Sequence, residues 1–359
     1  MKHSINFYFL ISVLLIIVFL FGILFGITGK YPSAIVQNAL NYHYDHLREP
    51  NVKFFGRTLS SGPHYFEADE SLKNLGERLE KFSVEKDDID KIVDVKINVL
   101  RKISKNIFYI DYLLNKKTYK VFFYSSAVSK NCKIIYIPGA GSHQAYQIFH
   151  RNKANYHNRR GLVLEAFKFC QILIPIYFNE GFLAQHNGSK ALNWNHLKYV
   201  LLRDHPTKSI RAKQLTDLAA LSLFAQKNAK KVALIGMSSG SIVAGILPAY
   251  FKYDAVFFSS GLSLTIGRAI GTKSDNVLLN FWGTQVYIRD YMRKFRQNVK
   301  AIAIAYGTAD PPLPAAEASS MFTCTRFRES MPTQCFNFAG KHVFPSKIGS
   351  SWLKEVIIP

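Results

Sequence analysis

Cysteines, acids and repeated segments are all scarce in this sequence of 359 residues. None of the four cysteines stands in a C-x-x-C pair, which excludes a zinc site built on such pairs. The absence of an internal repeat excludes a solenoid, and a hydrophobic content of 48% excludes global disorder. Because no nucleic-acid-binding motif accompanies the basic residues, their charge does not by itself predict nucleic-acid binding.

The shortage of acids leaves a strongly basic chain, with 46 Lys and Arg against 24 Asp and Glu and a net charge of +22. Acids concentrate in residues 67–94, whereas bases cluster in residues 151–160, 208–213 and 289–300. Such a body suits an anionic lipid surface or an anionic substrate. The alternative is a lysine-rich solvated surface that has no partner.

A single long apolar run, residues 7–29, carries no charge. At about 1.5 Å per residue it is long enough to cross a bilayer core of about 30 Å. A cleaved signal peptide would have a shorter apolar core and a small-x-small cleavage site, which the sequence does not clearly offer. We therefore expect a retained single-pass membrane anchor, and the short N-terminal tail favours a body outside the cytoplasm.

The four cysteines allow two interpretations. Cys132 and Cys170 lie at the edges of apolar runs and are expected to be core thiols. Cys324 and Cys335 flank a polar stretch, where they would form a disulfide in an oxidising compartment or stay free in a reducing one.

Short β-branched and aromatic runs alternate with helical patterns after residue 93. Residues 93–124 are expected to form antiparallel strands. Further strands are expected over residues 133–137, 172–177, 232–235, 255–258, 301–306 and 334–338, with helices at 145–169 and 210–227. This order predicts an α/β fold with a mostly parallel sheet and helices on both faces. The connection 262–298 is long enough to predict a lid-like insertion.

The segment Gly236-Met237-Ser238-Ser239-Gly240 joins an expected strand to an expected helix. A G-x-S-x-G pattern in this setting is typical of a sharp turn that exposes a nucleophilic serine. Ser238 is therefore the candidate nucleophile. The alternatives are a Gly- and Ser-rich connection without chemistry, or a phosphate-binding turn.

Three further features accompany this turn. Pro138-Gly139-Ala140-Gly141-Ser142 directly follows an expected strand, Asp310 ends the strand-end sequence Tyr306-Gly-Thr-Ala-Asp310, and His342 follows the last expected strand. No acid lies between residues 255 and 273, and no other histidine follows His205.

In this order of elements the chain resembles the α/β-hydrolase superfamily over residues 93–357. The resemblance implies a triad of Ser238, Asp310 and His342. It also implies an oxyanion hole formed by the N–H of Ser239 and an N–H of Ala140 or Gly141. Pro248 is expected to shorten or kink the helix that follows the turn.

Together these features predict three parts: an anchor (residues 1–30), an extension (31–92) and an α/β-hydrolase domain (93–359). The expected activity is cleavage of an ester or related acyl bond, with lipid or membrane-proximal substrates as one option, and it needs neither metal nor organic cofactor. An acyltransferase or a peptidase of the same fold, or a non-catalytic membrane-tethered binding module, are the alternatives. The expected partners are the acyl substrate and the membrane, with no nucleic acid.

Overall fold

The computed structural model describes residues 52–54, 57–59, 80, 83–126, 131–139, 145, 148, 162–177, 183, 204–205, 207–260, 288–308, 323–325, 327–339 and 343–358. They belong to the second of two compact units, residues 1–48 and 49–359. The predicted anchor lies outside this described part. Within it, every helix is too short or too polar to cross a bilayer.

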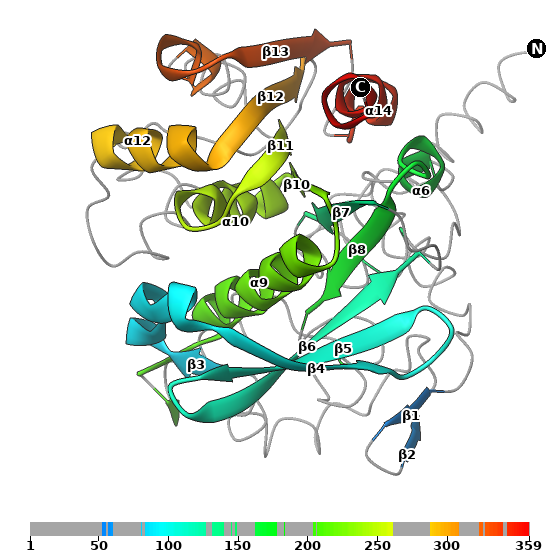
Figure 1. The fold of residues 1–359 in the computed structure, drawn as a ribbon, viewed down its shortest axis with the longest axis vertical. Helices are drawn as coiled ribbons and strands as arrows, with labels where there is room; N and C mark the ends of the chain where they lie inside the picture. The colour runs from blue at the N-terminus through cyan, green and yellow to red at the C-terminus, as the bar shows by residue number, and fades with distance from the viewer. Residues whose placement is uncertain are drawn as a thin grey trace, which may run out of the picture. The chain divides into compact units, whose positions relative to one another are not determined.

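A nine-stranded sheet forms the centre of the unit (Figure 1), and it runs in the order β13-β12-β11-β10-β7-β8-β6-β5-β4. The strands from β13 to β8 are parallel, and β6, β5 and β4 add antiparallel pairs. The predicted mostly parallel sheet with an antiparallel entry is thereby confirmed. The strand bounds are β4 (Lys96–Lys102), β5 (Ile107–Leu114), β6 (Lys117–Ser125), β7 (Cys132–Ile137), β8 (Gln171–Ile176), β10 (Lys231–Met237), β11 (Tyr253–Ser259), β12 (Val299–Gly307) and β13 (Thr333–Phe338).

Two small antiparallel strand pairs are separate from the main sheet. One joins β1 (Val52–Phe54) to β2 (Arg57–Leu59), and the other joins β3 (Val84–Glu85) to β9 (Lys208–Ser209). The second pair leads directly into helix α9, so the segment before residue 93 contributes to the packed body.

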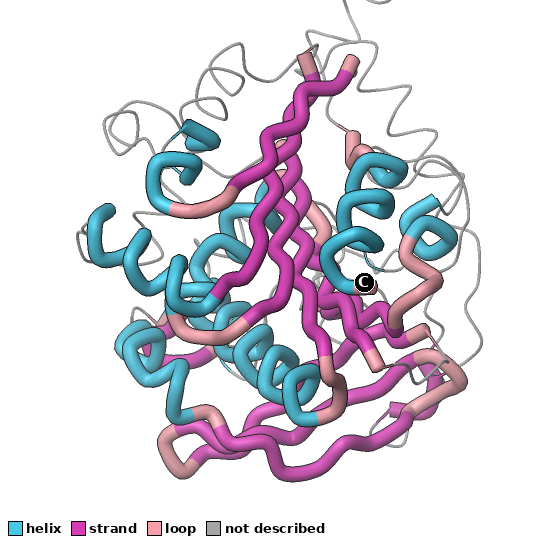
Figure 2. The backbone as a smooth tube through the Cα atoms, turned by 45° about the horizontal axis from the view of Figure 1, so that its top comes forward, coloured by secondary structure: helices cyan, strands magenta, loops and turns pink. Residues whose placement is uncertain are grey.

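Helices cover both faces of the sheet, as Figures 1 and 2 show. One face packs against η1 (Lys86–Asp94), α9 (Ile210–Lys227), α10 (Ser239–Ile246) and α12 (Ile288–Asn298). The other packs against α6 (Leu162–Ala166) and α14 (Ser346–Ile357). Strand β7 is buried along its whole length, as expected for a parallel strand covered on both faces.

The two helices that flank the candidate nucleophile agree with the predictions made for them. Ser209 caps α9, because its Oγ accepts a hydrogen bond from the N–H of Ala212 at 3.1 Å. The helix then spans residues 210–227, as predicted. After the nucleophile, α10 ends at Ile246 and a 3₁₀ turn, η3 (Leu247–Ala249), contains Pro248, which confirms the predicted shortening.

Part of the predicted insertion at residues 262–298 is a packed helix. Its residues 288–298 form α12, whose Phe295 ring lies 6.2 Å from that of Phe258 and 4.9 Å from that of Phe327. Phe295 is fully buried, so this helix belongs to the core.

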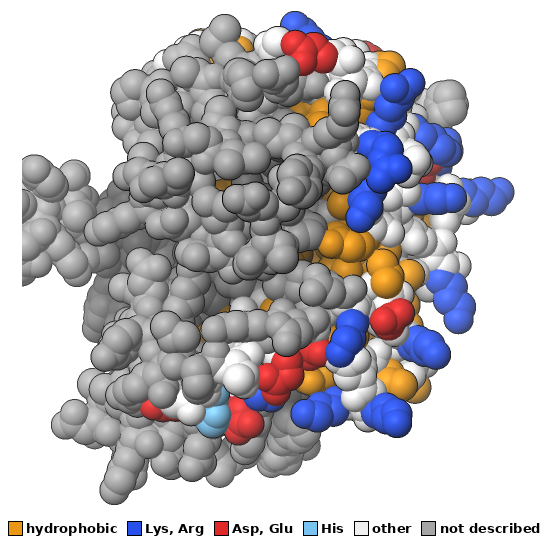
Figure 3. Space-filling model, turned by 90° about the vertical axis from the view of Figure 1, so that its left-hand side faces the viewer, with side chains coloured by type: hydrophobic (Ala, Val, Ile, Leu, Met, Phe, Trp, Pro, Cys, Tyr) orange, Lys and Arg blue, Asp and Glu red, His pale blue; other side chains and the backbone are white. Residues whose placement is uncertain are grey.

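Figure 3 shows one face of the molecule, on which the described residues lie mainly at the right. In Figure 3, Lys and Arg side chains gather along the right-hand border, the side that faces the viewer in Figure 1. The helix-to-strand connections, and hence the amino ends of the parallel strands, lie on this side (Figure 2).

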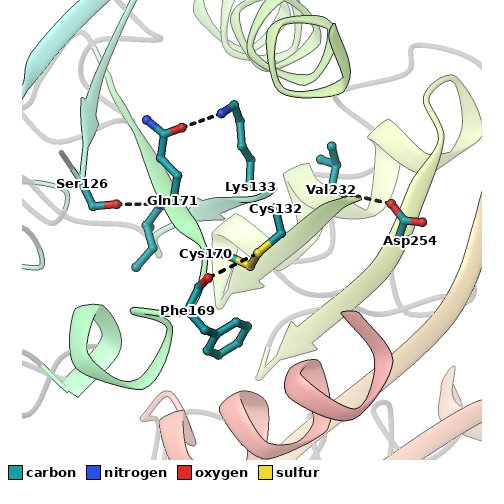
Figure 4. Close-up of a disulfide and its surroundings, with 9 residues drawn as sticks. Ser126, Cys132, Lys133, Phe169, Cys170, Gln171, Val232 and Asp254 are labelled. Carbon is teal, nitrogen blue, oxygen red and sulfur yellow. Dashed lines mark hydrogen bonds between the residues drawn. A yellow bond between two sulfur atoms is a disulfide. The ribbon is translucent and has the colours of Figure 1, made fainter. Parts of the chain in front are cut away.

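The prediction that Cys132 and Cys170 are core thiols is wrong. They form a disulfide with 5.0 Å between their Cα atoms, and Cys324 and Cys335 form a second one. The reason is topological, because β7 and β8 are neighbouring parallel strands and the two cysteines stand at their amino ends (Figure 4). Next to the first disulfide, Lys133 donates a hydrogen bond to Gln171 Oε1 at 2.5 Å.

Candidate active site

Ser238 stands in a strained backbone conformation between β10 and α10. Its φ is 53° and its ψ is −126°. A positive φ is uncommon for any residue with a side chain, and it persists only where the surrounding structure enforces it. A serine in this conformation, half-buried at the end of a central strand, has the geometry of a nucleophile elbow.

Steric crowding requires glycine at both glycine positions of the motif. A Cβ on Gly236 would lie 2.5 Å from Ser241 Cα, and a Cβ on Gly240 would lie 2.3 Å from the carbonyl oxygens of Ile137 and Pro138. No larger residue fits either position without a backbone shift. Helix α10 therefore lies directly against the end of β7, where the predicted oxyanion loop begins.

Hydrogen bonds to the neighbouring strand fix the turn. The N–H of Ser238 and the hydroxyl of Ser241 both donate to the carbonyl of Ser259, each at 2.8 Å. Ser241 Oγ also accepts from the N–H of Ser259 at 3.2 Å. Ser241 and Ser259 were not predicted from the sequence. The sequence feature that could have pointed to Ser241 is its place three residues after the nucleophile, at the start of an otherwise apolar helix.

Of the predicted oxyanion donors, only Ser239 is among the described residues. Ser239 is the first residue of α10, so its N–H belongs to the first turn, which has no intrahelical acceptor. Ala140 and Gly141 lie outside the described residues. The residue before them, Gly139, is buried.

Asp310 and His342 also lie outside the described residues, but the strands that lead to them end beside the elbow. The carboxyl ends of β10, β11, β12 and β13 share one level of the sheet. The N–H of Ser260 donates to Ala305 O, and that of Thr308 donates to Phe338 O, both at 3.0 Å. Asp310 follows Thr308 by two residues, and His342 follows Phe338 by four.

The chain is fixed again directly after His342. Phe344 is buried, and its ring lies 5.3 Å from that of Tyr136, 5.9 Å from that of Phe167 and 5.7 Å from that of Phe257. The segment that carries the predicted histidine is therefore anchored at both ends, by β13 and by this aromatic cluster.

A buried ion pair lies on the opposite face of the sheet, which α9 covers. Lys213 and Asp217, one turn apart on α9, pair with each other, and Tyr112 donates to Asp217 Oδ1 at 2.9 Å. Burial raises the pKa of Asp217 and lowers that of Lys213, while the partner's charge opposes each shift. This pair lines a small pocket together with Lys120, Phe122, Ile176, Tyr177, Leu183, Ile210 and Gln214.

Comparisons with known proteins yield only distant structural likenesses. No protein-family model matches the chain, and no curated protein matches it. Among solved structures, a Pyrococcus furiosus esterase has 11% identity and a TM-score of 0.40, with 74% of this chain and 94% of that one covered. An acylaminoacyl peptidase of Pyrococcus horikoshii has 11% identity and a TM-score of 0.39, with 69% and 38% covered.

A third likeness is to the acetyl ester-xyloside bifunctional hydrolase of Caldicellulosiruptor lactoaceticus, at 13% identity and a TM-score of 0.40, with 66% of this chain and 89% of that one covered. All three TM-scores are below 0.5. The strand order of this chain, its helices on both faces and its strained serine turn together support an α/β-hydrolase fold.

Proposed function

We propose that this chain is a serine hydrolase that cleaves an ester or a related acyl bond. The observation that carries the proposal is the backbone of Ser238, which is held at a positive φ at the end of β10 by two glycines and by the carbonyl of Ser259. Such strain costs about 1–3 kcal/mol and is concentrated at functional sites.

In the proposed reaction, Ser238 Oγ attacks the acyl carbonyl while His342 takes the hydroxyl proton. The developing oxyanion accepts hydrogen bonds from the N–H of Ser239 and from an N–H of Ala140 or Gly141. His342 then protonates the leaving group, and an acyl-enzyme remains. Water, deprotonated by His342, releases the acid and restores Ser238.

Asp310 is assigned the role of orienting His342 and stabilising its protonated form. Neighbouring strands are about 4.8 Å apart, so β12 and β13 lie about 10 and 14 Å from β10. Two or three extended residues cover about 7–10 Å, and a side chain adds the remainder. Loops that lean toward the elbow from Thr308 and Ala339 therefore suffice to assemble the triad.

For localisation, we propose a body outside the cytoplasm, tethered by residues 7–29. Support comes from the disulfides, because such bonds persist in oxidising compartments and are rare in the cytosol. Cells treated with a thiol-blocking reagent before lysis should yield a protein whose cysteines become accessible only after reduction. Four free thiols in that experiment would contradict the proposed compartment.

The activity is tested by labelling the full-length protein in membranes with a fluorophosphonate probe. Wild type and Ser239→Ala should both be labelled, because the second variant keeps its backbone N–H, whereas Ser238→Ala should not. His342→Ala should lose hydrolysis of a simple nitrophenyl ester. Labelling that survives Ser238→Ala would refute the nucleophile, and full activity of His342→Ala would refute the base.

A further inference from the structure

The amino ends of the parallel strands carry a second feature, which we call the amino-edge lysine surface. It consists of six lysines near the starts of β10, β11 and β12, at the end of α9 and within α12: Lys227, Lys230, Lys231, Lys252, Lys294 and Lys300. The last turn of α12 adds the exposed Arg296. Gln226 joins two of its elements by donating to the carbonyl of Lys252 at 2.7 Å. The side chain of Lys300 is 73% exposed.

Two lysines of this surface, Lys231 and Lys300, pair with the same carboxylate. Asp254 lies 2.8 Å from Lys300 Nζ and 3.6 Å from Lys231 Nζ, and it also accepts the N–H of Val232 at 2.8 Å (Figure 4). Lys294 lies 5.7 Å from the centre of the Tyr250 ring. A single carboxylate cannot neutralise six ammonium groups, so the surface keeps a large positive charge.

Lysine carries most of the charge on this surface, and the exposed Arg293 and Arg296 of α12 carry the rest. Lysine carries a mobile, strongly hydrated point charge, which suits a diffuse layer of anionic headgroups better than the fixed fork of arginine does. Both disulfides favour a compartment that lacks nucleic acid. The apolar run at residues 7–29 would in addition keep the body close to a bilayer.

We propose that the amino-edge lysine surface lies against the anionic lipid headgroups of the membrane that holds the chain. The proposal does not depend on the hydrolase activity. The lysines act together, because each ammonium near an anionic headgroup layer strengthens association about fivefold at low salt. Asp254 weakens this attraction by pairing with two of the six.

The test uses the full-length protein in nanodiscs of phosphatidylcholine alone or with about one third phosphatidylglycerol. Lysine acylation is followed by peptide mapping. Lys230, Lys252 and Lys300 should react about fivefold more slowly in the anionic discs, and about 0.5 M NaCl should abolish the difference. Lys96 and Lys116, near the opposite ends of the strands, serve as internal controls and should react equally in both.

Two variants make the result specific. Lys230→Glu/Lys252→Glu should abolish the protection of Lys227 and Lys300, whereas the matched Lys96→Glu/Lys116→Glu should retain it. Equal reaction rates in the two lipids would overturn the proposal, as would equal protection of the control lysines. Protection by a single-stranded oligonucleotide in neutral discs, without protection by phosphatidylglycerol, would assign the surface to nucleic acid instead.

Discussion

The two ends of the same parallel strands differ in chemistry. At the carboxyl ends stand serines, glycines and backbone N–H groups around a strained turn, whereas the amino ends carry lysines, a disulfide and one shared carboxylate. Between them the strands are apolar and buried on both faces. Parallel pairing thus separates a surface suited to chemistry from a surface suited to attachment, although both arise from the same short segments.

The two edges are also held together differently. At the carboxyl edge, backbone hydrogen bonds connect each strand end to the next: Ser238 to Ser259, Ser260 to Ala305 and Thr308 to Phe338. At the amino edge, the N–H groups of Lys230 and Lys231 donate to Asn131 O, and side chains add connections through Cys132–Cys170, Lys133–Gln171 and the ion pairs of Asp254. A reducing agent or acid should therefore affect the amino edge, whereas the carboxyl edge should be sensitive to changes in backbone conformation.

The largest effect is expected at Ser238. Both Ser238→Ala and Ser238→Gly should lower kcat by about 10⁴-fold or more, because each removes the nucleophile. Ser238→Gly should unfold with a free energy about 1 kcal/mol higher than Ser238→Ala, because glycine adopts a positive φ without strain. Ester hydrolysis and urea unfolding in detergent measure the two effects. Equal stability of the two variants would show that the turn is not strained.

The next effect is expected at the amino edge. Cys132→Ser/Cys170→Ser should lower the free energy of unfolding by about 4 kcal/mol, the chain-entropy value for a loop of this length, since the cysteines are 38 residues apart. If the double variant remains folded, its kcat should fall far less than that of Ser238→Ala. A loss of kcat comparable to that of Ser238→Ala in a stably folded protein would contradict the separation of the two edges.

A smaller effect is expected from Gly240→Ala. The added Cβ would lie 2.3 Å from two carbonyl oxygens, so α10 and the loop after β7 must move apart. A displacement of about 1 Å at the oxyanion donors should reduce kcat/KM by about 100-fold. Gly349→Ala is the control, because its nearest contacts would be ring carbons at 3.4 Å. Equal activity of the two variants would argue against an oxyanion site at this contact.

The smallest effect concerns pH. Burial alone would raise the pKa of Asp254, but hydrogen bonds from Lys300 and Val232 and the charges of Lys300 and Lys231 together lower it below its ordinary 3.8. The carboxylate should therefore stabilise the fold above about pH 4, and this contribution should be lost as the pH falls through the lowered pKa. Because its lysine partners are open to solvent, with Lys300 73% exposed, Asp254→Asn should cost only about 1 kcal/mol at pH 7.

Thermal unfolding of wild type and Asp254→Asn, followed from pH 7 downward, should show a difference that shrinks and disappears as the pH falls through the lowered pKa. A difference in stability that persists at low pH would mean that Asp254→Asn destabilises the fold through its shape or its hydrogen bonds and not through the loss of charge.

The sequence predicts local structure well where one signal dominates. The helix at residues 210–227 and the strands around Ser238 are predicted correctly because helical spacing of apolar residues and short apolar runs mark them. The strained turn at Ser238 is also a local feature, because the two glycines that it requires lie within five residues of chain. These features need no knowledge of distant contacts.

Distant contacts were predicted less well. Pairing of Cys132 with Cys170 requires that β7 and β8 be neighbours, which no local pattern shows. The bonds of Ser241 to Ser259 depend in the same way on the adjacency of β10 and β11. Asp310, His342, Ala140 and Gly141 remain predictions from order along the chain, supported by the strand ends that lead to them.

The length of the central strands acts as a spacer. A strand of about six residues spans roughly 20 Å, and β7, β10 and β11 have six or seven. With its amino edge resting on headgroups, the protein would hold Ser238 about that far above the bilayer. Acyl compounds dissolved in water would then reach the serine more readily than lipids in the supporting leaflet, so the sheet itself would select the phase from which substrates arrive.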